Sequence, residues 1–161
     1  MLCRKDTLGG KIMASTLSNA ALTVTVTENI TLNGSNHGST KQMTISGINE
    51  IQKRIMTCAT GGTQIYAGGS SVSYGTFETS SVKYVRITNL DSENYIILHL
   101  EGNSHYSQIR LDAGHIFMLT RTSSAFDNSS AVTTFSAEDI TRIDAMANTA
   151  AVDIELLVAS A

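Results

Sequence analysis

The 161-residue sequence lacks proline and tryptophan, has only two cysteines, and is only 16% charged. Two cysteines are too few for a disulfide framework, so we expect Cys3 and Cys58 to be free thiols. The 11 Lys and Arg residues are scattered, and the formal net charge is −3. A nucleic-acid partner is therefore not expected, because binding phosphates requires clustered positive charge.

The sequence also lacks a long apolar run. No stretch approaches the roughly 18 apolar residues of a transmembrane helix. The first residues do not contain the apolar core of a secretory signal. We therefore expect a soluble protein that is made in the cytoplasm and has no membrane partner.

Serine and threonine are abundant instead, at about a quarter of the chain. A chain of this length is expected to form one domain that buries roughly 70% of its unfolded surface without disulfides. Thr alternates with apolar residues in the predicted strands, so it takes the place of charge on their solvent-facing sides. Strands with Thr in place of charged residues on their solvent-facing sides are common in extended or multimeric β-proteins.

Four short strands in a row give the clearest fold signal. They are predicted at residues 82–90, 95–100, 105–111 and 115–119, and they are separated by Asp-, Asn- and Gly-containing turns. Short, closely spaced strands with such turns indicate an antiparallel sandwich or barrel. Further strands are predicted at residues 22–32, 42–48, 63–67, 140–147 and 152–158.

One segment is ambiguous, because Ile48, Ile51 and Ile55 also fit helical spacing behind a possible cap at Ser46. We favour a strand at residues 53–59, since a Gly-Gly turn and another β-like run follow. The count is then roughly eight to ten strands. The predicted fold is an all-β, antiparallel, jelly-roll-like β-sandwich with a polar N-terminal arm.

The predicted domain organisation is an N-terminal arm at residues 1–21 and a β-sandwich domain at residues 22–161. The arm is polar and aperiodic, and we expect it to be ordered only where a partner binds it. Gly9-Gly10-Lys11 can be encoded by a purine-rich ribosome-binding sequence upstream of Met13. We therefore expect translation to begin at Met13, which would leave residues 1–12 out of the native product.

Candidate catalytic and metal-binding residues have simpler explanations. His99, His105 and His115 lack the spacing that preorganises zinc ligands on one element, so we expect solvent-facing strand histidines. Turn chemistry accounts for several carboxylates. Tyrosines could bind sugars by stacking, but sheet stabilisation is the commoner role of strand tyrosines. The carboxylates are Asp91, Glu93, Asp112, Asp144 and Asp153, and the tyrosines are Tyr66, Tyr74, Tyr84, Tyr95 and Tyr106.

No nucleophile motif or phosphate-binding loop is present. The sequence therefore predicts no enzyme, no cofactor, and no catalytic, cofactor-binding or metal-binding residues. Contacts with partners are expected from the arm before Leu22 and from two polar loops, at residues 68–81 and 121–136.

Three segments carry a resemblance to a known group of proteins. Residues 83–90 read Lys-Tyr-Val-Arg-Ile-Thr-Asn-Leu, residues 111–114 read Leu-Asp-Ala-Gly before a strand, and the chain closes on an alternating strand from Val152 to Ser160. In these features the last half of the chain resembles small β-sandwich virion proteins encoded by tailed phages of marine and cyanobacterial hosts.

The resemblance implies a structural function. Such domains serve as capsid decoration (cement) proteins, head fibres and tail accessories. The expected protein is a decoration protein on the virion surface that binds the major capsid protein at capsomer junctions and stabilises the shell against internal DNA pressure. Self-association, most plausibly as a trimer, would add avidity. The alternative is a head-fibre or tail accessory protein that binds host-surface glycans.

Overall fold

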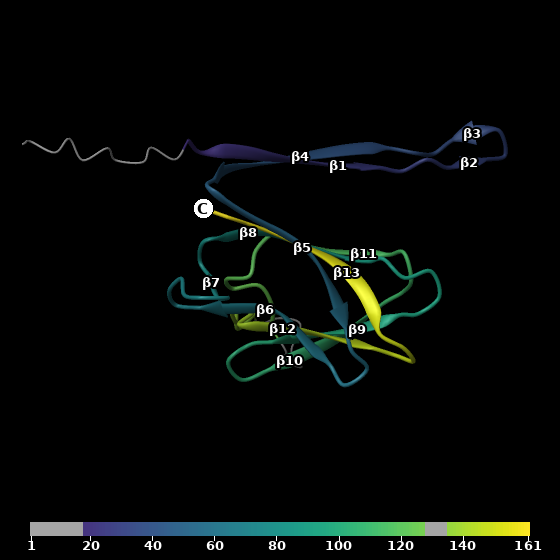
Figure 1. Cartoon of the computed structure of the whole chain (residues 1–161). Coiled ribbons are helices and arrows are strands. Elements are labelled where there is room, and N and C mark those ends of the chain that lie inside the picture. Colours follow the sequence, from purple (N-terminus) through teal and green to yellow (C-terminus); the bar gives the residue numbers. More distant parts are fainter. Residues whose placement is uncertain (1–17, 128–134) are drawn as a thin grey trace, which may run out of the picture.

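The computed structural model describes residues 18–127 and 135–161, and these residues form an all-β structure without helices (Figure 1). None of the described segments is therefore a helix that could cross a membrane. The strands are β1 (Ala20–Thr27), β2 (Thr31–Leu32), β3 (Ser35–Asn36), β4 (Thr40–Ile48), β5 (Glu50–Cys58), β6 (Thr63–Gly69), β7 (Phe77–Glu78), β8 (Val82–Asn89), β9 (Ile96–Glu101), β10 (Tyr106–Leu111), β11 (Ile116–Leu119), β12 (Arg142–Ala147) and β13 (Val152–Ser160).

Two sheets form an antiparallel β-sandwich, as predicted. The five-stranded sheet has the order β10-β9-β12-β6-β7, and the four-stranded sheet has the order β11-β8-β13-β5. Alternate residues of each strand face the space between the sheets, where apolar side chains are shielded from water. In β13, Ile154, Leu156 and Val158 are fully buried, and they meet fully buried residues from the other sheet such as Leu98 and Ile143.

The four consecutive strands predicted from the sequence are present as β8 to β11, with ends that differ by one residue at most. The ambiguous segment after Ile48 is the strand β5, which pairs with β13 from Glu50 to Cys58. It begins three residues earlier than predicted. Helical spacing of isoleucines is overridden here because β13 offers a complete ladder of hydrogen bonds and a buried neighbour.

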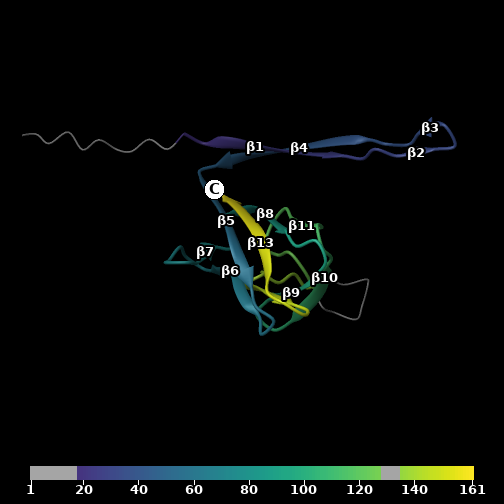
Figure 2. The same ribbon diagram turned by 45° about the vertical axis from the view of Figure 1, so that its right-hand side comes forward.

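A long hairpin projects from the sandwich, and we refer to residues 20–48 as the hairpin. β1 pairs only with β4, and β2 pairs only with β3 near the tip. Residues 22–48, which the sequence predicts to be part of the sandwich, thus lie outside its two sheets. Figures 1 and 2 show the hairpin alongside the sandwich, with β2 and β3 extending past it. The predicted N-terminal arm lies almost entirely outside the described residues.

The predicted loop at residues 68–81 contains part of the core. β7 pairs in parallel with β6, and Phe77 is buried, with its ring stacked on Tyr66 at a centroid distance of 5.6 Å. An isolated aromatic residue in a polar segment gives no periodic signal, so this contact could not be predicted. Of the other predicted loop, residues 128–134 are outside the described part, and Phe126 packs against the core.

Candidate functional site

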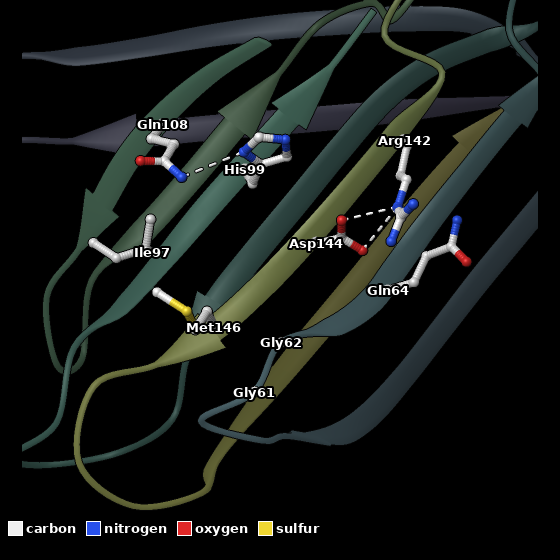
Figure 3. Close-up of a pocket in the computed structure, with 9 residues that line it drawn as sticks. All are labelled: Gly61, Gly62, Gln64, Ile97, His99, Gln108, Arg142, Asp144 and Met146. Atoms are coloured by element: carbon white, nitrogen blue, oxygen red, sulfur yellow. Dashed lines mark hydrogen bonds and ion pairs between the residues drawn. The ribbon is translucent and has the colours of Figure 1, made fainter.

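A row of polar side chains crosses the outer surface of the five-stranded sheet (Figure 3). Register places Gln64 opposite Asp144, Asp144 opposite His99, and His99 opposite Gln108, so four strands each contribute one residue. These positions alternate with core positions such as Leu98 and Ile143, which fixes their outward direction. With Arg142, two positions from Asp144, we refer to these residues as the polar face.

Four side chains of the polar face form two contacting pairs. Arg142 Nε donates to both carboxylate oxygens of Asp144, at 3.0 and 2.8 Å. Gln108 Nε2 lies 3.4 Å from Nδ1 of His99. The His99 ring is stacked on the ring of Tyr106, with centroids 5.1 Å apart. These contacts hold donors and acceptors in fixed positions on a rigid sheet.

The polar face lines a shallow pocket of about 260 Å³ that is completed by Gly61, Gly62, Ile97 and Met146. None of its nine lining residues carries a hydroxyl or thiol nucleophile, and Asp144 is their only carboxylate. A glycosidase of the usual kind needs a pair of carboxylates. Fixed polar groups beside apolar side chains instead suit noncovalent binding of a polar ligand.

The three histidines highlighted by the sequence have separate partners. His99 faces Gln108 across the ladder, so it does not meet His105 as the hairpin turn would allow. His105 Nδ1 donates to Glu138 at 2.6 Å, and His115 Nδ1 donates to the carbonyl of Ala113 at 2.9 Å. Within the described ranges, no group of three or more His, Cys, Asp or Glu residues is arranged to hold a metal ion.

Turn chemistry explains only some of the predicted carboxylates. Asp91 accepts hydrogen bonds from the backbone N–H groups of Glu93 and Asn94, both at 2.7 Å. These bonds lower its pKa, because they stabilise the charged form. Asp144 was predicted to lie in or beside a turn, and this was wrong. It lies within β12, where its carboxylate forms an ion pair with Arg142.

The five tyrosines occupy different environments, so the prediction of outer strand positions holds for only some of them. Tyr66 is buried in the core and Tyr84 is buried beneath the hairpin, whereas Tyr74 is fully exposed in a loop. Tyr95 lies under the guanidinium group of Arg110, 3.9 Å from the ring centroid. Tyr106, beside the polar face, is 63% exposed. It is therefore the tyrosine best placed to contact a ligand of that face.

The hairpin presents a second candidate surface. Cross-strand pairing puts Leu22 beside Ile45 and Val24 beside Met43 on one side, and Thr23 beside Thr44 on the other. Near its base the apolar side belongs to a small buried cluster in which Ile48 of the hairpin meets Tyr84 and Ala159 of the sandwich. Farther along, Val26, Ile30, Leu32 and Met43 are 44%, 54%, 58% and 37% exposed, respectively.

Sequence reasoning recognised the alternation in β1 but took its apolar side to be part of the sandwich. The missing information was the partner strand, because pairing with β4 alone leaves the hairpin covered on only part of one side. Gln64, Gln108 and Arg142 were not highlighted by the sequence at all. Their only signal was position, since each occupies an outward place in a strand.

The comparisons with known proteins give no relative for this chain. No protein-family pattern, no curated protein and no solved structure matches it.

Proposed function

We propose that this chain is a structural protein of a tailed-phage virion, and that it acts as a capsid decoration protein on the outside of the shell. The observation that carries the proposal is the hairpin, a long two-stranded sheet with exposed apolar side chains, attached to a rigid sandwich. The last half of the chain also resembles virion proteins of tailed phages, and this resemblance is the reason that we propose a virion as its location.

A hairpin of this kind is suited to contact between proteins. A two-stranded sheet is marginally stable alone in water, and both of its edges offer unpaired backbone groups to another strand. Residues 20–32 extend over about 40 Å at about 3.3 Å per residue. The hairpin is thus long enough to contact more than one neighbouring molecule.

We assign shell binding to the polar side of the hairpin. Thr23, Thr25 and Thr27 on β1 are paired with Thr44, Gln42 and Thr40 on β4. This side carries hydroxyl and amide groups without charge, which suits hydrogen bonding to the major capsid protein at capsomer junctions. The added contacts would hold the shell against internal DNA pressure.

The order of the strands supports a virion role. We read the orders β5-β13-β8-β11 and β6-β12-β9-β10 as those of a jelly roll, in which two Greek keys form an eight-stranded sandwich. This architecture is used in viral capsid and lectin domains. We also propose self-association as a trimer, because several weak shell contacts per assembly add through avidity.

The proposal is tested by adding the purified chain to phage heads that lack it and heating them. We expect binding and a higher temperature of DNA release. Thr25→Arg should weaken both effects, because it places a bulky charge on the docking side, while Thr149→Arg in the exposed β12–β13 turn should leave both unchanged. Failure of the unmodified chain to bind the heads would contradict the proposal.

The polar face favours a second candidate function, binding of a host-surface glycan by a fibre or tail accessory protein. Sugars present hydroxyl groups and apolar ring faces, which match Asp144, Arg142 and the exposed ring of Tyr106. Glycan-array binding that is lost in Tyr106→Ala and retained in the control Tyr74→Ala would support this function. Absence of binding by the unmodified chain would exclude it.

A further inference from the structure

The outer side of the four-stranded sheet carries an apolar surface that the hairpin leaves uncovered. Strand register places Ile55 and Ile116 in one row across the sheet and Met118 in the next. With Ile51 on β5 they form what we call the apolar face. The exposed fractions of Ile51, Ile55, Ile116 and Met118 are 59%, 66%, 54% and 43%.

The apolar face continues an apolar contact that already exists within the chain. The base of the hairpin packs on Tyr84 and Ala159, which lie in the same row of the sheet as Ile51. Between the hairpin and the sheet remains a groove of about 310 Å³, lined largely by apolar side chains that include Val26, Met43 and Met118. The hairpin therefore covers one end of the sheet and leaves the rest open.

The far part of the hairpin cannot cover this face in its own chain. It passes the edge strand β11, and its tip, where β2 pairs with β3, lies beyond the sandwich in both Figures 1 and 2. The longest sandwich strands, of nine residues, span only about 30 Å. Ile30 and Leu32 at the tip are thus exposed, and the described residues of the sandwich do not reach them.

The charged groups of the sheet do not oppose such a contact. Glu155 lies in the row of Ile55 and Ile116, and it forms ion pairs with two residues of the Met118 row, with Lys53 at 2.9 Å and with Arg86. These partners lower the pKa of Glu155 despite the opposing effect of burial, so the carboxylate stays charged and paired. Covering the sheet would therefore not bury an unpaired carboxylate, and burial of an unpaired charge is what strongly destabilises a protein.

We propose that the apolar face is the interface with a second copy of this chain, and that its occupant is the far part of that copy's hairpin. Residues 26–43 would supply about 18 residues, slightly fewer than the roughly 20–30 that each partner contributes to a standard interface. The hairpin of one copy then meets the sheet of the next, so the contact is head-to-tail. We infer that the rotation between copies closes this contact into a ring instead of an open filament. This interface proposal rests on the self-association proposed above, and it specifies the surface through which the copies associate.

The test is the mass of the full-length chain in solution, measured by light scattering and sedimentation over a range of concentrations. We expect a closed oligomer that Ile55→Lys and Leu32→Ser each weaken by roughly tenfold or more, as is usual for central interface residues. Thr149→Lys is the control, because Thr149 is exposed in the turn between β12 and β13, outside the apolar face and the hairpin. It should leave the mass unchanged.

Cysteine cross-linking identifies the occupant directly. Chains with Cys3→Ser and Leu32→Cys are mixed with chains carrying Cys3→Ser and Ile55→Cys, and then oxidised. We expect a disulfide-linked pair of the two different chains. A monomeric unmodified chain, an oligomer unaffected by Ile55→Lys, or the absence of this mixed pair would overturn the proposal. A monomer that still binds phage heads would overturn this interface alone and leave the decoration function standing.

Discussion

Val24 of the hairpin packs in the same small apolar cluster as Tyr84 of the sandwich. This cluster seats the base of the hairpin on the four-stranded sheet. It is separate from the main core, which lies between the two sheets. The position of the hairpin therefore depends on few side chains, and its release should be separable from unfolding of the sandwich.

Tyr84→Ala should release the hairpin. Loss of the ring removes most of the apolar contact beneath it, so local opening should become easier than global unfolding. We expect trypsin to cleave at Lys41, which is exposed on β4, roughly tenfold faster, corresponding to about 1.4 kcal/mol. Tyr74→Ala is the matched control. Equal cleavage rates for the two variants would show that Tyr84 does not hold the hairpin.

Tyr66→Phe should destabilise the sandwich slightly. The Tyr66 hydroxyl donates to Thr122 Oγ1 at 3.3 Å, and that hydroxyl donates to the carbonyl of Thr79 at 3.0 Å, all in buried surroundings. Removing the first donor costs about 1 kcal/mol, whereas Tyr66→Ala also empties core volume and costs roughly 3–5 kcal/mol. Urea denaturation measures both values. No difference between the two variants would contradict this assignment.

Glu138 should make stability depend on acid pH. Burial raises its pKa, but hydrogen bonds from His105 and from the backbone N–H of Ser104 outweigh this and lower it. A lowered pKa in the folded state means that the unfolded chain binds the proton more readily. The stabilisation is then complete above the unfolded pKa of about 4.3 and is lost as pH falls through the folded value.

The measurement for Glu138 compares urea midpoints of the unmodified chain and Glu138→Gln at neutral pH and at about pH 3. We expect a clear difference at neutral pH that shrinks in acid. The exposed residue Glu93, changed to Gln, serves as control. A difference that stays constant between the two pH values would show that the charge of Glu138 contributes nothing.

Cys58 should be unreactive in the folded protein. It is a free thiol, as the sequence predicted, and it is fully buried. Burial together with nearby Asp153 raises its pKa to about 11. Few molecules then carry the reactive thiolate at neutral pH. In a Cys3→Ser background, a thiol reagent should modify Cys58 only after denaturant is added. Rapid modification of the native protein would contradict the packing of β5 on β13.

Local sequence patterns predicted the strands of the sandwich well. Features that depend on pairing between distant strands could not be predicted in the same way. The alternation in residues 82–119 and its Asp-, Asn- and Gly-containing turns are local, so the four strands there were predicted nearly to the residue. The pairing of β1 with β4, the core position of Phe77, and the row from Gln64 to Gln108 depend on which strands are neighbours. The residue pattern of a single strand does not specify which other strand pairs with it.

The most direct test of the proposed decoration function is the number of copies of this chain in purified particles of its phage, determined by quantitative mass spectrometry against the major capsid protein. A decoration protein that occupies equivalent junctions over the whole shell is predicted to be present in hundreds of copies, as shell symmetry requires. A count of about a dozen or fewer would place the chain in a tail or fibre and contradict the account.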